Sequence, residues 1–124
     1  DRRFLVLLAT FRLEHDDPAA VKERMSSFIA YRKQTQPPGA SLGSIFKNPP
    51  GDYAGRLIEA AGLKGHQIGT AMVSPVHANF FINVGKDAAK AADYYALIQY
   101  VQAKVFETSG HLLELEIELM GQWQ

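Results

Sequence analysis

The sequence predicts an α+β fold from two observations. Segments with strand-like alternation and segments with helical spacing follow one another in the order β-α-β-α-β-β-α-β, and Gly-rich turns separate them. No internal repeat, low-complexity tract or linker divides the 124 residues. That length suits one domain with a hydrophobic core of its own. We therefore expect a single α+β domain.

The first two elements are expected to be a strand and an amphipathic helix. Residues 4–13 alternate, and their first half is apolar on both faces, which predicts a strand that is covered on both sides there. An acidic cap at Asp17 and a Pro at position 18 then mark a helix start. The helix is expected over residues 18–34, before a Pro-Pro-Gly stop. Its apolar stripe consists of Val21, Met25, Phe28 and Ile29.

The middle of the chain is expected to alternate short strands with a short helix. Residues 41–49 read SLGSIFKNP, a short ordered piece that the following Pro and Gly terminate. Residues 54–61 predict a short helix with Leu57, Ile58 and Ala61 inward, and Gly62 fits the left-handed position after it. Residues 63–74 are strand-like, with a turn or bulge at Gly65 and Gly69.

Three longer periodic segments complete the chain. Residues 77–84 alternate and predict a strand. Residues 88–108 predict a long helix that Gly110 closes. Its apolar stripe consists of Tyr94, Leu97, Ile98, Val101 and Val105. Residues 112–120 alternate strictly between Leu or Ile and Glu, which predicts a last strand with one apolar face.

Composition excludes several classes of function. Thirteen basic and thirteen acidic residues cancel, so we expect no nucleic-acid partner and no membrane-surface patch. The longest apolar run, residues 4–9, is far too short to span a bilayer. The absence of Cys rules out disulfides, thiolate metal sites and Cys nucleophiles. The four His residues lack metal-ligand spacing, so no metal site is expected.

A few polar residues could carry chemistry, and the residues alone leave each with two readings. Ser44 follows a Gly and lies in neither a nucleophile-elbow motif nor a Walker loop. It is either a turn former or a proton donor. His77 and Asn79 are either a hydrogen-bonded structural pair or ligand contacts. The glutamates of the last strand either face solvent, or one of them enters a cleft and serves as a general acid.

The order of several motifs resembles one family. The motifs are SLGSIFKNP (41–49), AGRLIE (54–59), AGLKG (61–65), IG (68–69), VS (73–74), HANF (77–80), Asn83, LELEI (113–117) and Gly121. From residue 32 to residue 121 this order is similar to the C-terminal, substrate-binding domain of the UDP-N-acetylenolpyruvoylglucosamine reductase (MurB) family, in its shorter type. Residues 1–31 resemble the strand and helix that join an N-terminal FAD-binding domain to residues 32–124.

The resemblance implies a fold and an activity. The fold would be a mixed or antiparallel sheet packed with about three helices. The family reduces UDP-N-acetylglucosamine enolpyruvate to UDP-N-acetylmuramate for peptidoglycan synthesis in the bacterial cytoplasm. The full-length enzyme uses FAD and NADPH. No cofactor is expected on this chain, which by itself should be inactive. Its partners would be the enolpyruvyl substrate and its own FAD-binding domain.

The resemblance also assigns roles to individual residues. Ser44 matches the serine that protonates C2 of the substrate, and Glu116 matches the carboxylate that supports the enol-like intermediate or supplies its proton. Residues implied to contact the substrate are Gln36, Asn48, Lys64, His77 and Arg32. Leu115 and Glu118 depart from the family pattern, which commonly has Pro and Arg there. The alternatives are a non-catalytic module that binds a nucleotide sugar or another anion, and a pure assembly domain.

Overall fold

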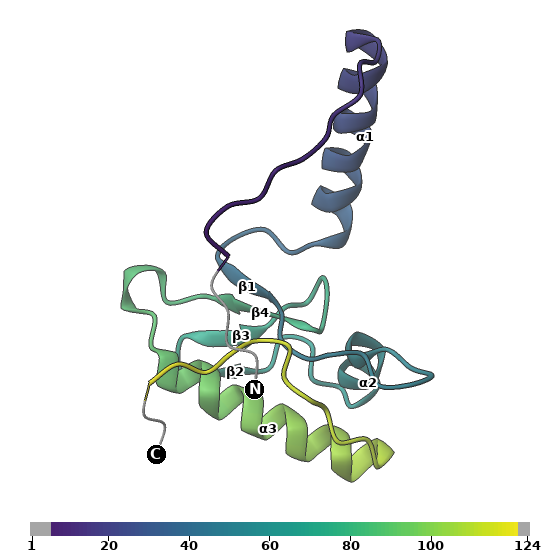
Figure 1. Ribbon diagram of the computed structural model, residues 1–124. Helices are drawn as coiled ribbons and strands as arrows, with labels where there is room; N and C mark the ends of the chain where they lie inside the picture. The colour runs from purple at the N-terminus through teal and green to yellow at the C-terminus, as the bar shows by residue number, and fades with distance from the viewer. Residues whose placement is uncertain (1–5, 122–124) are drawn as a thin grey trace.

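The structure, a computed structural model, describes residues 6–121 and has the expected α+β architecture (Figure 1). A four-stranded sheet lies between the long helix α3 on one side and the projecting helix α1 on the other. The elements in chain order are α1 (Pro18–Thr35), β1 (Ser41–Ser44), α2 (Ala54–Ala60), β2 (Gln67–Ile68), β3 (Ala71–Val73), β4 (Phe80–Asn83), the 3-10 turn η1 (Lys86–Ala88) and α3 (Ala91–Ser109).

The sheet is antiparallel throughout, in the order β1-β4-β3-β2. The expected break in residues 63–74 is confirmed, because β2 and β3 are short strands that meet in a turn at Gly69, whose φ is +54°. The strand expected over residues 77–84 is shorter and occupies Phe80–Asn83. Residues 77–79 instead form a turn, which becomes part of the site described below.

Two helix predictions are confirmed with their buried faces. Helix α3 buries Leu97, Ile98, Val101 and Val105, and Gly110 caps it in the left-handed conformation at φ +71°. Helix α2 buries Leu57 and Ile58. The core between these helices and the sheet also takes in Ile45, Phe46, Val73, Phe81 and Leu113. The segment 43–49 is therefore anchored in the core by its own apolar pair.

The strand expected over residues 4–13 is wrong for its described part. Residues 6–13 form no strand and are exposed, and residues 4 and 5 lie outside the described region. Alternation alone could not supply a neighbouring strand, and strands exist only as paired ladders. The helix α1 is confirmed with its N-cap at Asp17, but none of its side chains is buried. Met25, Phe28 and Ile29 stand in solvent instead of facing a core.

The last predicted strand is also largely wrong. Residues 112–120 make one isolated antiparallel bridge, Phe46 with Leu115, and otherwise run as an irregular segment. The predicted alternation holds where they touch the core: Leu113 is buried, Leu115 and Ile117 are half-buried, and the glutamates between them are exposed. Apolar side chains therefore anchor this segment although a full hydrogen-bond ladder does not form.

Two kinds of feature are absent from residues 6–121. None of the helices there combines the length and apolar character needed to cross a bilayer. The same residues contain no group of three or more His, Asp or Glu side chains arranged to hold a metal ion.

Candidate functional site

Ser44 occupies the end of a bulged edge strand. Ser41 pairs with Ile82 and Ser44 pairs with Phe80, so β1 holds one residue more than β4 over the same stretch. The residue before Ser44 is Gly43, at φ +80°, a conformation that side chains with a Cβ rarely adopt. The bulge ends regular pairing at Ser44 and leaves its side chain exposed. This accounts for the Gly-Ser pair in physical terms.

The next residues are held by Asn79, which is only 3% exposed. The Asn79 side chain accepts a hydrogen bond from the Phe46 N–H (3.0 Å) and donates one to the Phe46 carbonyl (2.8 Å). Its own carbonyl accepts the N–H of Ile45 at 2.9 Å. A carboxamide offers one acceptor and donor groups, so it can replace a missing backbone partner. Asn79 therefore holds the segment that follows β1 in place although regular strand pairing has ended.

A tight turn places His77 beside the same segment. The buried Ser74 hydroxyl oxygen accepts the N–H groups of Val76 (3.1 Å) and His77 (3.3 Å). The N–H of Asn79 donates to Nδ1 of His77 at 3.2 Å. The imidazole also lies against Gly55, where an added Cβ would approach it to 3.1 Å. The structure thus confirms a hydrogen-bonded pair of His77 and Asn79.

A pocket of about 430 Å³ opens between the bulge, the His77 turn and α2. It brings together three residues to which the family resemblance assigned roles, Ser44, Asn48 and His77. Asn48 is oriented by the helix, because its Oδ1 accepts the N–H of Ala54 at 3.1 Å. Its amide NH₂ remains as a donor. The remaining lining residues are Tyr53, Gly55, Arg56, Glu59, Val76, Ala78 and Asn79.

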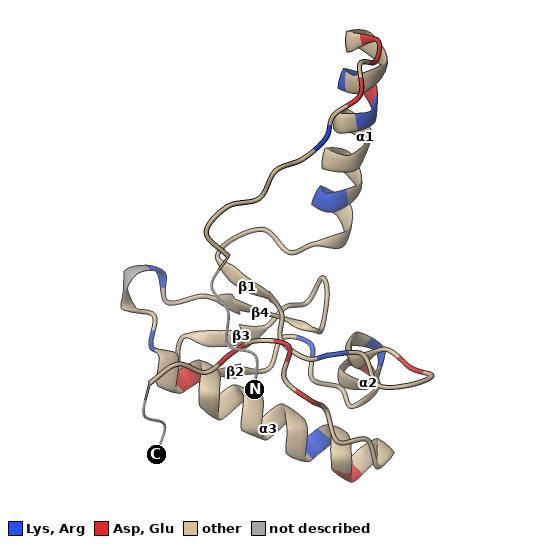
Figure 2. Cartoon of the chain, viewed as in Figure 1, with Lys and Arg blue, Asp and Glu red and all other residues tan. Residues whose placement is uncertain are grey.

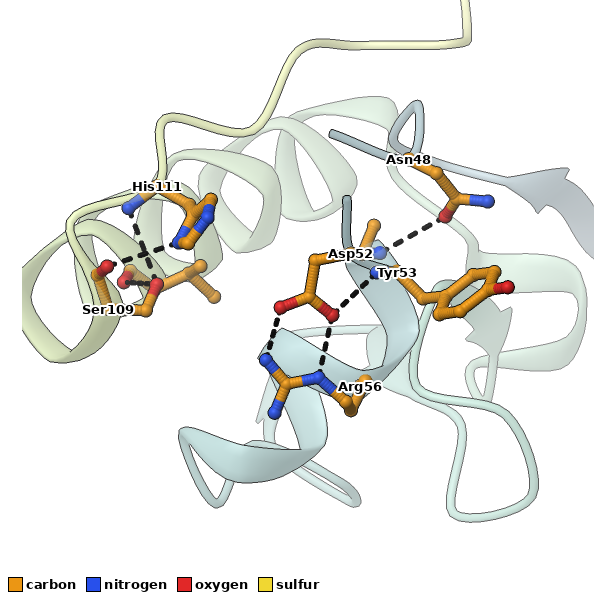
Figure 3. Close-up of polar contacts among 8 residues, drawn as sticks. Asn48, Asp52, Tyr53, Arg56, Ser109 and His111 are labelled. Carbon is orange, nitrogen blue, oxygen red and sulfur yellow. Dashed lines mark hydrogen bonds and ion pairs between the residues drawn. The ribbon is translucent and has the colours of Figure 1, made fainter. Parts of the chain in front are cut away.

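Arg56 adds a cation to this pocket and is held by Asp52 (Figure 3). Arg56 Nε donates to Asp52 Oδ1 at 2.6 Å, and a second guanidinium nitrogen contacts Asp52 Oδ2. The Tyr53 N–H also donates to this carboxylate at 2.7 Å. The guanidinium, and after it this N–H, hold the pKa of Asp52 well below its usual range. Asp52 therefore stays ionised and keeps Arg56 at the pocket.

The other candidates lie outside this pocket lining. Lys64 forms an ion pair at 2.8 Å with Glu59, which lines the pocket. Arg32 contacts Gln36 through two hydrogen bonds of 3.3 Å at the end of α1, which Figure 1 shows projecting from the sheet. The Glu116 side chain is exposed, while its N–H donates to the Ile45 carbonyl at 2.9 Å.

The two residues that depart from the family pattern have separate surroundings. Leu115 bridges Phe46 and packs on the core, so it fits its position. Glu118 lines a different cavity of about 380 Å³, beside Tyr94 and Leu42. Figure 2 shows acidic groups (red) spaced along the segment 112–120, and one of them, Glu114, lies 3.6 Å from Lys47.

Sequence reasoning missed three parts of the site. It treated Asn79 as the partner of His77 and did not see that its side chain holds Phe46. It assigned no role to Arg56 or to Tyr53, although both line the pocket. The i,i+4 spacing of Asp52 and Arg56 was the available signal for the ion pair. No local signal indicates the contact between Asn79 and Phe46, because 33 residues separate them.

Comparison with known proteins finds one family. Residues 32–120 match the family described as UDP-N-acetylenolpyruvoylglucosamine reductase, C-terminal domain. The UDP-N-acetylenolpyruvoylglucosamine reductase of Chloroflexus aurantiacus is 53% identical over 116 residues, which is 94% of this chain and 38% of that protein. The protein of the same name from Thiobacillus denitrificans is 50% identical over 92% of this chain and 35% of its own length.

A solved structure gives the same result. The crystal structure of UDP-N-acetylenolpyruvylglucosamine reductase (MurB) from Thermus caldophilus superposes with a TM-score of 0.72 at 41% identity. The match covers 86% of this chain and 37% of the other. This chain therefore spans less than two fifths of the length of the proteins that it matches.

Proposed function

Because this chain belongs to the family of UDP-N-acetylenolpyruvoylglucosamine reductase C-terminal domains, we propose that it is the substrate-binding part of such a reductase. The longer protein would reduce UDP-N-acetylglucosamine enolpyruvate to UDP-N-acetylmuramate. Residues 32–124 would form the substrate-binding domain, and residues 1–31 would connect it to an FAD-binding domain. The convergence of Ser44, Asn48 and His77 on one pocket supports this proposal.

The pocket suits an anionic ligand. The Asn48 amide, the Ser44 hydroxyl and the Arg56 guanidinium all carry hydrogen-bond donors. An arginine fork matches phosphate oxygens, and a carboxamide or a hydroxyl adds donors around them. The volume of about 430 Å³ lies in the range of small-molecule sites. We assign Asn48 and His77 to the diphosphate and uridine, and Lys64 to the neighbouring rim beside Glu59.

Ser44 is the proposed proton donor to the reacting carbon. Reduction of the enolpyruvyl double bond builds negative charge on the enolate, and donors aimed at that charge lower the barrier. A Ser hydroxyl on a bulged strand end can approach such a carbon from a fixed backbone. Glu116 would support the intermediate or supply its proton, and its backbone lies across from the residue that follows Ser44. Its exposed carboxylate would have to turn toward the substrate.

The described residues do not form a dinucleotide site of the Rossmann type. Such sites hold the pyrophosphate at a Gly-rich turn between a parallel strand and a helix. The sheet here is antiparallel throughout, and α2 begins after a Pro-Pro-Gly turn. FAD and NADPH belong to the proposed full-length reductase, whose FAD-binding domain would hold the flavin. Gln36 and Arg32 would reach the substrate only with α1 placed against the pocket.

Calorimetric titration with uridine diphosphate (UDP) tests the proposal. The variant Asn48→Asp keeps an oxygen that accepts the Ala54 N–H but replaces the amide donor with a negative charge. We expect it to weaken UDP binding about tenfold or more, since losing a hydrogen bond to a charged group costs roughly 1.5–3 kcal/mol. Asn83→Asp, which lies outside this pocket, should leave the affinity unchanged. Failure of the unmodified chain to bind UDP would contradict the proposed substrate pocket.

A second candidate function is a module that binds a nucleotide sugar without chemistry. The exposure of the Glu116 carboxylate outside the Ser44 pocket favours it. The longer protein discriminates between the two candidates. A reductase oxidises NADPH when the enolpyruvyl substrate is added, whereas a module binds UDP sugars and leaves NADPH unchanged.

A further inference from the structure

Asn79 contacts both walls of the pocket from a buried position. Its side chain forms two hydrogen bonds with Phe46, which lies between Ser44 and Asn48. Its peptide N–H donates to the ring of His77 on the facing wall. Within the described residues no buried side-chain polar atom is left without a hydrogen-bond partner, so this network is complete.

The hydrogen bond to His77 has a consequence for the chemistry of the ring. A peptide N–H can only donate, so Nδ1 of His77 must be the acceptor and carries no proton. The neutral imidazole then carries its proton on Nε2. Of the two ring nitrogens, Nε2–H is thus the one left to donate to a ligand. A ligand oxyanion accepts a hydrogen bond, and in this tautomer Nε2–H can donate it. In the other tautomer the proton lies on Nδ1, and Nε2 has none to donate.

We propose that Asn79 is a positioning residue: its carboxamide fixes the segment that carries Ser44 and Asn48, and its N–H fixes His77 as an Nε2–H donor. The donors of the pocket then point to the oxygens of a nucleoside diphosphate, and this assignment of the ligand rests on the proposed function. Asn79 itself need not touch the ligand. A role in stability alone would leave the His77 tautomer and the ligand affinity unaffected.

The tautomer is measured without any ligand. Long-range ¹H–¹⁵N spectra of the ¹⁵N-labelled 124-residue chain, recorded where the ring is neutral, distinguish a protonated from an unprotonated ring nitrogen. We expect Nδ1 of His77 to be unprotonated and Nε2 protonated. A neutral ring protonated on Nδ1 would overturn the proposal whatever the chain binds.

Variants then test the coupling between the two walls. Asn79→Asp replaces the donor to the Phe46 carbonyl with an oxygen and keeps the acceptor for the Phe46 N–H. Asn83→Asp makes the same exchange at a matched site, where Asn83 donates to the Lys86 carbonyl and accepts from the Gly85 N–H, both at 2.8 Å. Without the carboxamide donor the backbone of residue 79 is tied less firmly to Phe46, so its N–H should no longer stay in place against Nδ1 of His77. We therefore expect Asn79→Asp to mix the His77 tautomers and to weaken UDP binding about tenfold, the loss of one good hydrogen bond. Asn83→Asp should do neither.

If Asn79→Asp folds and has the same His77 tautomer and the same UDP affinity as Asn83→Asp, the positioning role of Asn79 is overturned. If circular dichroism shows that Asn79→Asp is unfolded, Asn79→Ser, which is smaller and uncharged, takes its place with the same expected result. If the unmodified chain does not bind UDP, the proposed function fails, and the tautomer spectra of the chain and its variants still decide the role of Asn79.

Discussion

The N–H of Glu116 donates a 2.9 Å hydrogen bond to the carbonyl of Ile45. This bond ties together the two segments that carry the proposed catalytic side chains, Ser44 and Glu116, although 72 positions separate them in the chain (116 − 44). The N–H of Lys47 donates in the same way to the Glu114 carbonyl, at 2.9 Å. The backbone thus joins the segments, while the exposed Glu116 side chain and the Ser44 pocket remain separate.

Leu113 should control whether the segment that carries Glu116 stays in place. It is 1% exposed, and Gln102 donates to its carbonyl at 2.8 Å. We expect Leu113→Ala to lower the free energy of unfolding by about 2–5 kcal/mol, the usual result of emptying a core site. Leu112→Ala is the matched control, since Leu112 is 71% exposed and should change stability by less than about 0.5 kcal/mol. Urea unfolding measures both, and equal effects would contradict the anchoring role.

Gly43 should matter for binding as well as for stability. Its φ of +80° disfavours a Cβ, although space around it is open. We expect Gly43→Ala to cost about 1–2 kcal/mol of backbone strain and to move Ser44. Gly39→Ala is the control, because Gly39 has φ +100° and equally open surroundings outside the pocket. Both variants should lose similar stability, and Gly43→Ala should show the larger loss of UDP affinity.

Asp93 should make part of the free energy of unfolding depend on pH. Its carboxylate accepts the N–H and the hydroxyl of Thr70, both at 2.7 Å, which joins the start of α3 to the turn between β2 and β3. These bonds lower the pKa of Asp93 below its ordinary value of about 3.9. The Asp93 carboxylate therefore binds a proton more readily in the unfolded chain than in the folded one. The contribution is complete above the unfolded pKa and is lost as the pH falls through the lower folded value.

The test compares Asp93→Asn with Glu107→Gln, which removes a charge from an exposed pair with Lys104 on the same helix. We expect Asp93→Asn to be less stable near neutral pH and to approach the unmodified chain in acid. Glu107→Gln should have almost no effect on thermal unfolding at either pH. If Asp93→Asn is as stable as the unmodified chain at neutral pH, the link to Thr70 does not support the fold.

The face of α1 should add nothing to the stability of this chain. Phe28 is 65% exposed, whereas Phe81 is fully buried. We expect Phe28→Ala to change the free energy of unfolding by less than about 0.5 kcal/mol and Phe81→Ala to cost about 3–5 kcal/mol. Loss of more than 1 kcal/mol on Phe28→Ala would show that α1 packs on the domain in solution.

The sequence predicted the elements whose signals are local. Helix α3 combines a helical stripe with a Gly cap, and both are confirmed. Helix α2 and the turn at Gly69 likewise carry their own signals. The strands at the two ends of the chain were wrong for a shared reason: alternation describes a face but not a partner. Residues 112–120 have one buried leucine, Leu113, without a ladder, and residues 6–13 have neither a buried side chain nor a ladder.

In the site, as in the fold, local features could be read from the sequence, whereas contacts between distant segments could not. Gly43 next to Ser44 is a local signal for a turn or a short ordered piece, but the bulge found there was not predicted. Ser44 and His77 line the same pocket because the order of the strands puts β4 beside β1. Periodicity does not encode that order, and Ser44 and His77 were assigned to one site only through the family resemblance. The carboxamide of Asn79 that joins the two walls follows from tertiary contacts alone.

Ser44→Ala gives the sharpest test of the proposed chemistry. If the longer protein is the proposed reductase, reduction of its flavin by NADPH would not involve this hydroxyl, and we expect the rate of that step to be unchanged. Transfer to the enolpyruvyl substrate needs the proton, and a lost general acid typically lowers the rate by about 10²–10⁴-fold. Ser41→Ala is the matched control, because Ser41 is an exposed serine at the other end of β1 and outside the pocket. Stopped-flow absorbance separates the two half-reactions. Equal loss in both, or equal effects of the two substitutions, would remove Ser44 from the proton-donor role.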